Sequence, residues 1–213
     1  RGLIRGHVGS GTFVRDLTEQ ERYTPMLDRA RIDLGPSAAP IIPGDLGHCA
    51  LAAALSRLSA RADLGALSGY QAHAGSSAQR AAGVRWLAMT GVVAQPDELT
   101  VCSGAQHATV MLLSALASAA GVMVEELTYP GVLSAAQWLR LPTHRVAIDE
   151  EGIIPEALAA ACRDSGARVL YCAPTNHNPT TAVMSHKRRQ AIAALCQKHG
   201  IAIIENGALA PLI

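Results

Sequence analysis

Short apolar runs alternate with longer, partly polar stretches through most of the chain. The runs Arg168–Ala173 and Ile201–Ile204 are too short for helices and are typical of buried parallel strands. Between them, Ser185 suits an N-cap and Gly200 suits a C-terminal stop, which predicts a helix over 185–199. The same pattern predicts strands at 99–102, 122–126 and 143–148 and helices at 105–120, 131–140 and 155–165. Strands that alternate with helices at this spacing indicate an α/β fold with a mostly parallel, doubly wound sheet.

Polar residues follow several of these predicted strands. Asn178 comes after the first strand named above, and Asn206 ends the second. Open α/β sheets bind ligands at the carboxyl ends of their strands, so both amides are expected to face a ligand. An Asn before Pro also forms turns, which is the alternative explanation for Asn178.

Two further candidates lie upstream. Ser103-Gly104-Ala105-Gln106 precedes a long apolar helix, and the N-terminus of a helix attracts phosphate through its free N–H groups and its dipole. Small residues also serve plain strand-to-helix packing, which is the alternative there. Tyr129, in the turn Glu125–Gly131, offers a flat face to a heteroaromatic ring, or is simply a half-buried turn residue.

In this order the motifs resemble the large domain of fold-type I, pyridoxal-phosphate-dependent aminotransferases of classes I and II, from about residue 32 onward. Asn178-Pro179-Thr180-Thr181 stands for the family's Asn-Pro-Thr-Gly. The resemblance implies pyridoxal 5′-phosphate as the cofactor. It also implies one role for each candidate: phosphate binding by Gly104, Ala105 and Gln106, ring stacking by Tyr129, a hydrogen bond from Asn178 to the 3′ oxygen, and a place beside the ring nitrogen for Asn206.

The chain departs from that family at positions that matter for chemistry. Asn206 replaces an Asp, Leu209 replaces a Tyr, and Thr181 replaces a Gly that tolerates positive φ. A neutral amide does not stabilise a pyridinium by charge, so transaminase chemistry is expected to be weakened. The only lysines, Lys187 and Lys198, both fall in the predicted helix rather than after a strand. No catalytic residue is therefore assigned, and the chain is expected to be inactive by itself.

The N-terminus carries a different signal. Gly9–Val14 resembles the wing of a GntR-type winged helix-turn-helix domain, with Arg1, Arg5 and Arg15 as phosphate-seeking charges, although an ordinary glycine-rich hairpin has the same pattern. A wing followed by an aminotransferase-like region is the layout of MocR-type transcriptional regulators. The expected organisation is a wing at 1–15, a linker at 16–31, an N-terminal aminotransferase-like segment at 32–98, and the first part of the cofactor-binding large domain at 99–213.

Composition limits the choice of partners. With 49% hydrophobic residues, 16% charged residues and a net charge of +1, most of the chain is globular and is not a nucleic-acid surface. No run reaches the roughly 18 apolar residues of a membrane span. The five cysteines lack C-x-x-C spacing, which indicates reduced thiols in the cytoplasm, and no metal-binding pattern is present.

The resemblance implies a homodimer in the full-length protein, DNA contact through an N-terminal domain that lies outside this chain, and a small amino compound or amino acid as effector. Two alternatives stay open: a fragment of a genuine class I/II aminotransferase, and a catalytically inactive dimerisation module. The family's strand order further predicts two later strands between the first and fourth strands of this chain. Leu99–Cys102 would then stand about 10 Å from Arg168–Ala173, with unpaired edges that favour aggregation.

Overall fold

The computed structural model describes residues 4–7, 11–14, 46–61, 65 and 69–212. They belong to two units, Arg1–Ser68 and Gly69–Ile213. The first unit contains an antiparallel hairpin, β1 (Ile4–His7) and β2 (Gly11–Val14), and the helix α1 (Leu46–Ser59). A hairpin therefore forms where the wing is predicted, while its relation to a DNA-binding domain stays a prediction. The predicted linker, 16–31, lies outside the described residues.

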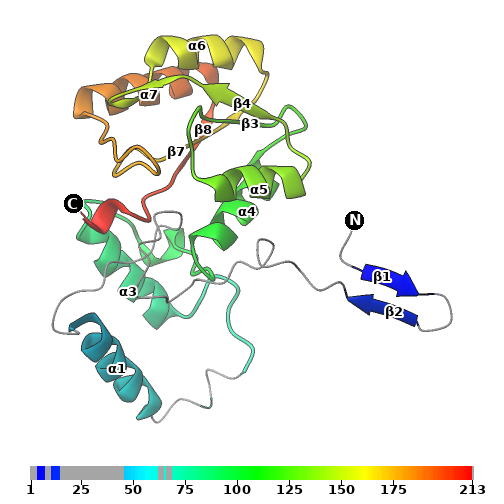
Figure 1. Cartoon of the computed structure of the whole chain (residues 1–213). Coiled ribbons are helices and arrows are strands. Elements are labelled where there is room, and N and C mark those ends of the chain that lie inside the picture. The colour runs from blue at the N-terminus through cyan, green and yellow to red at the C-terminus, as the bar shows by residue number, and fades with distance from the viewer. Residues whose placement is uncertain (1–3, 8–10, 15–45, 62–64, 66–68, 213) are drawn as a thin grey trace, which may run out of the picture. The chain divides into compact units, whose positions relative to one another are not determined.

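The second unit is an α/β layer structure (Figure 1). Its elements are α3 (Ser77–Ala88), η2 (Pro96–Glu98), α4 (Ala105–Leu116), β3 (Val122–Glu125), α5 (Pro130–Trp138), β4 (Thr143–Val146), β5 (Ile148–Asp149), β6 (Gly152–Ile153), α6 (Pro155–Asp164), β7 (Val169–Cys172), α7 (His186–His199), β8 (Ala202–Glu205) and η3 (Ala210–Leu212).

Four parallel strands form the sheet, in the order β4-β3-β7-β8. Alternate residues of each strand point to opposite faces, because the side-chain period of a strand is two. Met123 and Leu170 pack with α6 and α7, whereas Val124 and Tyr171 pack with α4 and α5. Both faces of β3 and β7 are thus covered, which explains their continuous apolar sequence and confirms the predicted doubly wound α/β fold.

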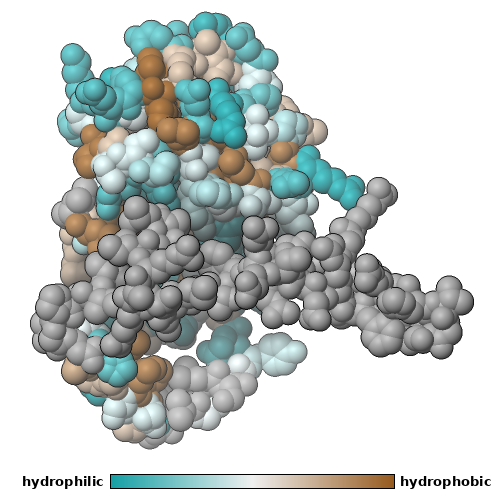
Figure 2. Space-filling model, viewed as in Figure 1, coloured by the Kyte–Doolittle hydropathy of each residue, from teal (hydrophilic) through white to brown (hydrophobic). Residues whose placement is uncertain are grey.

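The outer surface over α6 and α7 is mixed, with hydrophilic residues between scattered hydrophobic ones (Figure 2). Both ends of α7 agree with the sequence prediction. The Ser185 hydroxyl accepts a hydrogen bond from the N–H of Arg188 at 3.2 Å, and Gly200 adopts φ +63°. The N–H of Ile201 donates to the carbonyl of Cys196 at 2.8 Å, which closes the last turn.

Three predictions about the strands are wrong. Leu99–Cys102 is not a strand, and the N–H of Val101 donates instead to the carbonyl of Ala74 at 3.0 Å. The predicted strand at 143–148 breaks at Ala147, because Ile148 and Asp149 turn away and pair with β6.

The expected gap beside Arg168–Ala173 is also absent. β8 pairs with β7 along its whole length, so β8 forms the edge of the sheet. A strand–helix–strand connection as short as β7–α7–β8 places its second strand beside the first, and that local preference decides the order.

Candidate functional site

The start of α4 presents open backbone donors. Gly104 is the N-cap residue with φ +90°, and no side chain caps the helix. The first intrahelical bond runs from the N–H of Ala108 to the carbonyl of Gly104 at 3.2 Å. The N–H groups of Gly104, Ala105 and Gln106 have no hydrogen-bond acceptor within the described residues. A Cβ added at Gly104 would meet open space, so these donors are accessible to an anion.

The side chain of Gln106 ties this helix start to the turn after β3. Its Nε2 donates to the carbonyl of Gly131 at 2.8 Å. A Cβ on Gly131 would collide with the Tyr129 ring and with the Gln106 amide oxygen. Gly131 therefore lets Tyr129, half-buried at the N-cap of α5, fold against the start of α4. The predicted phosphate-binding and ring-stacking residues lie together.

Asn206 follows β8, and its side chain is already engaged at both ends. Its Nδ2 donates to the hydroxyl of Tyr171 at 2.6 Å, and its Oδ1 accepts from the N–H of Ala208 at 3.0 Å. Its own N–H donates to the carbonyl of Cys172 at 2.8 Å, which extends the β7–β8 pairing by one residue. Burial raises the pKa of Tyr171 to about 12, although the Asn206 hydrogen bond lowers it. The pair is therefore neutral at physiological pH.

Asn178 lies in the loop between β7 and α7, next to the strand that precedes Asn206. Its half-buried side chain has no hydrogen-bond partner within the described residues, so its amide is free for a ligand. The Asn178–Pro179 peptide bond is cis, and Thr181 adopts φ +59°. Thr181, at the position of the family's Gly, thus has the left-handed backbone conformation although its side chain is β-branched.

The base of this loop is closed. The N–H of Met184 donates to the carbonyl of Pro174 at 2.8 Å. Arg189, from α7, donates to the same Pro174 carbonyl at 2.8 Å, to the Thr175 hydroxyl at 2.7 Å and to the Met184 carbonyl at 3.0 Å. These bonds hold residues 174 and 184 side by side, so Asn178 projects from a fixed base.

Sequence reasoning missed a buried pair next to Asn178. Glu125, at the end of β3, and His177 are 0% and 3% exposed, and Glu125 Oε2 lies 3.2 Å from His177 Nε2. The two atoms are close but poorly aligned for a hydrogen bond. In the sequence, Glu125 is only the polar end of an apolar run, and its partner His177 lies far along the chain. No local sequence pattern therefore links the two residues.

The remaining candidates lie elsewhere. Lys187 and Lys198 are both exposed on α7, Lys187 in its first turn and Lys198 in its last. Within the described residues, no group of three or more His, Cys, Asp or Glu residues is placed to hold a metal ion, and no helix is long and apolar enough to cross a membrane.

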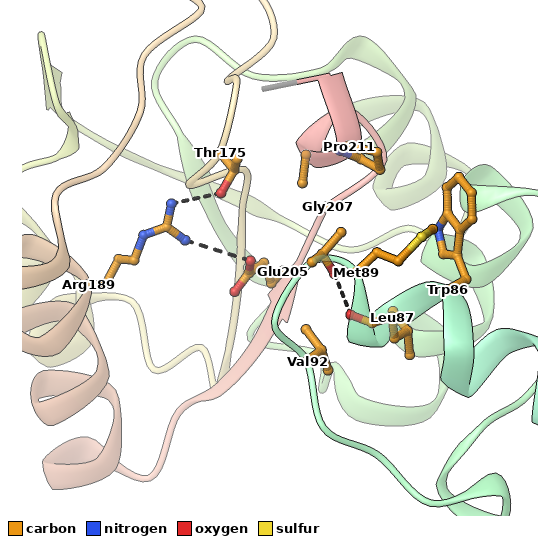
Figure 3. A pocket seen from close by; sticks show the side chains of 11 residues that line it. Trp86, Leu87, Met89, Val92, Thr175, Arg189, Glu205, Gly207 and Pro211 are labelled. Atoms are coloured by element: carbon orange, nitrogen blue, oxygen red, sulfur yellow. Dashed lines mark hydrogen bonds and ion pairs between the residues drawn. The ribbon is translucent and has the colours of Figure 1, made fainter.

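A cavity of about 990 Å³ lies beside β8, and it does not include the predicted cofactor residues (Figure 3). Its polar side chains already have partners: Arg189 points to Thr175 and forms an ion pair with Glu205 at 3.9 Å. Its other walls are mainly apolar, and come from Trp86, Leu87, Met89, Val92, Ala210 and Pro211. The free donors at α4 and Asn178 are therefore not part of this cavity.

The doubly wound sheet, the open donors at the start of α4, Tyr129 in the turn and the one free amide, Asn178, together define an α/β fold whose candidate ligand site lies at the carboxyl ends of its strands. The chain belongs to the aminotransferase class I and II family, which matches residues 41–206. Its fold is of the aspartate-aminotransferase-like, PLP-dependent transferase type.

Individual relatives match different shares of the chain. The HTH-type transcriptional regulator YdeF of Bacillus subtilis is 27% identical over 207 residues, which is 97% of this chain and 44% of YdeF. Aminotransferase swnA of Metarhizium robertsii is 39% identical over 92 residues, which is 40% of this chain and 18% of swnA. This chain thus spans less than half the length of either relative.

Among solved structures, the α-aminoadipate aminotransferase LysN of Thermus thermophilus has a TM-score of 0.67 and 24% identity, and the match covers 79% of this chain and 42% of LysN. LysN was solved in complex with N-(5′-phosphopyridoxyl)-L-leucine. At this identity the likeness shows the fold alone.

Proposed function

We propose that this chain is the cofactor-binding part of an effector-sensing domain in a MocR-type, GntR-family transcriptional regulator. The supporting observation is the extent of the match to YdeF, which takes in 97% of the chain and therefore residues outside the aminotransferase region at 41–206. The match to swnA takes in 40% of the chain. In a MocR-type protein the residues before 41 would hold the DNA-binding wing at 1–15, the linker at 16–31 and the start of the sensing domain.

The residues present fit pyridoxal 5′-phosphate in part. The N–H groups of Gly104, Ala105 and Gln106 would hold its phosphate, Tyr129 would stack on its ring, and the unpaired amide of Asn178 would donate to its ring oxygen. When bound, this cofactor supplies an electron sink for negative charge that develops beside an amino group.

At the ring nitrogen the fit is different. One N–H of the Asn206 amide donates to the Tyr171 hydroxyl, and the amide carries no charge. Asn206 therefore cannot keep the ring nitrogen of the cofactor protonated by electrostatic attraction. Neither lysine lies after a strand, where a covalent link to the cofactor would form in the family. The geometry therefore favours binding of the cofactor, and of an amino compound beside it, over turnover by this chain.

The cofactor part of the proposal is tested with pyridoxamine 5′-phosphate, because this compound has no aldehyde to react with surface amines. We expect it to bind the chain, and pyridoxamine without the phosphate to bind at least about tenfold more weakly, since charge-assisted hydrogen bonds to phosphate are strong. Tryptophan fluorescence and calorimetry measure both affinities. Asn178→Ala should weaken binding, whereas Gln197→Ala, on the exposed face of α7, should not. Equal affinity with and without phosphate would refute the site.

The regulator part is tested with the full product of the gene. We expect a dimeric cytoplasmic protein that binds DNA from its own upstream region, with an affinity that changes when the cofactor and an amino acid are added. Transaminase turnover without DNA binding would instead support the genuine aminotransferase, which is also compatible with the family membership. Dimerisation without cofactor binding would support the inactive module.

A further inference from the structure

We propose that Glu125 and His177 form a buried clamp that fixes the turn carrying Asn178, which makes Glu125 a positioning residue for the ligand of this site. The inference rests on the proposed cofactor binding and goes beyond it, because neither residue belongs to the predicted site. Three observations carry it: the burial of the carboxylate, the way His177 spans the turn, and the lack of any other partner for the Asn178 side chain within the described residues.

Glu125 joins two strands from within the core. Its side chain is fully buried at the end of β3, and both carboxylate oxygens accept from the N–H of Ala173, at 3.3 and 3.1 Å. Ala173 is the first residue after β7. A carboxylate removed from water needs a compensating partner, and one backbone N–H is a weak one. The imidazole of His177 is the further partner that the structure provides.

His177 in turn braces the loop with both its ring and its backbone. Its Nδ1 lies 2.7 Å from the hydroxyl of Thr180 and also accepts from the N–H of Thr180 at 3.4 Å. Its N–H donates to the carbonyl of Ala182 at 2.9 Å, and its carbonyl accepts from the N–H of Thr181 at 2.6 Å. The two sides of the turn are therefore tied through one residue, which itself is held by Glu125.

Asn178 is the next residue after His177 and carries no competing contact of its own. Its direction is set by the peptide that His177 anchors, and small misplacements of a binding group are costly. A buried polar or ionic pair contributes little net stability compared with an apolar packing of the same volume. A positioning role explains a buried polar pair at this place better than a contribution to stability does.

The test uses Glu125→Gln in the whole chain, followed by amide hydrogen exchange. We expect exchange at Thr181 and Ala182 to become at least about tenfold faster, while Val124 in β3 stays protected, because the clamp opens locally. Leu158→Ala is the matched control: it removes a fully buried side chain on α6, so it should lower global stability without a selective effect on the turn. Unchanged exchange at Thr181 in Glu125→Gln would overturn the clamp.

A second variant covers the case in which Glu125→Gln does not fold. Thr180→Val keeps the shape of an exposed residue and removes the hydroxyl that meets His177 and that also accepts from the N–H of Ala182 at 3.3 Å. Exchange at Thr181, whose N–H donates to the His177 carbonyl, is therefore the readout, and it should become faster by a smaller factor, about threefold. No change in a folded Thr180→Val protein would count against the clamp.

Ligand affinity provides the positioning readout. For pyridoxamine 5′-phosphate we expect about a tenfold loss in Glu125→Gln and none in Leu158→Ala, and the double variant Glu125→Gln/His177→Gln should bind no worse than Glu125→Gln alone. Independent, additive losses would refute the coupling. If the unaltered chain does not bind this ligand, the proposed function fails and Glu125 has no ligand to position; the exchange data then decide separately whether the clamp exists.

Discussion

Thr181 offers a direct test of the loop geometry, because it places a β-branched residue at φ +59°. The left-handed region costs an L-residue roughly 1–2 kcal/mol, and β-branched residues fall at the upper end. Thr181→Gly removes that cost. Glycine loses more backbone entropy on folding, about 0.5–1 kcal/mol, and the exposed hydroxyl of Thr181 gives up its bond to the Thr180 carbonyl. We expect a net stabilisation of about 0.5–1 kcal/mol.

Urea unfolding followed by circular dichroism measures the difference, and a gain of 1 kcal/mol should raise Tm by roughly 2–4 °C in a chain of this size. Two controls isolate the backbone term. Thr181→Ala removes the hydroxyl but keeps the strain, so it should stay within about 0.5 kcal/mol of the unaltered chain. Gly200→Ala makes the opposite change at φ +63° and should destabilise by about 1 kcal/mol. If Thr181→Gly is no more stable than Thr181→Ala, the strain assigned to this turn does not exist.

Three further outcomes follow from the structure. The Arg188 hydrogen bonds hold the pKa of Asp149 below its ordinary value of about 3.9, so the pair stabilises the fold above that pH and loses its effect as the pH falls through the lowered pKa. Asp149→Asn should therefore lower the urea midpoint at neutral pH and match the unaltered chain at about pH 2. Asn206→Asp keeps the contact to Tyr171, because the tyrosine hydroxyl can donate to the carboxylate. Asn206→Leu loses both side-chain hydrogen bonds and should lower the free energy of unfolding by about 1–2 kcal/mol in the same assay. Burial raises the pKa values of the Cys162, Cys172 and Cys196 thiols, that of Cys196 to about 11. A thiol reagent at mildly alkaline pH should therefore label Cys49 and Cys102 in the folded chain, and the three buried cysteines only in urea, as measured by mass spectrometry.

The fold was predictable wherever local signals agreed with one another. The helix from Ser185 to Gly200 has a capping residue, a stop and two flanking apolar strands, and the structure has all of them. Leu99–Cys102 has the composition of a strand but no neighbour to pair with among the described residues, and a strand is stable only as part of a sheet. Sheet order depended in the same way on the β7–α7–β8 connection rather than on any single segment.

The site was predictable as a set of positions and not as a network. The placement of Asn178 and Asn206 after neighbouring strands follows from alternation alone, and their roles toward a cofactor remain predictions. The hydrogen bond from the Asn206 amide to the Tyr171 hydroxyl depends on the β7–β8 register, which pairs Tyr171 with Ile204. Glu125 and His177 meet only because β3 lies next to β7, and no pattern within either segment reveals that neighbour.

The closed base of the 174–184 loop makes its tip an exchangeable module. The Met184–Pro174 bond and Arg189 fix the two ends of the loop, and His177 ties the loop to the sheet through Glu125, so residues 178–181 form a tip whose hydrogen bonds stay within the loop. The entropy of closing a loop grows only with the logarithm of its length, so doubling the tip adds roughly 0.6 kcal/mol. Under the proposed function, ligand preference at this site can therefore diverge by replacement of residues 178–181, while His177 and the core that holds it stay unchanged.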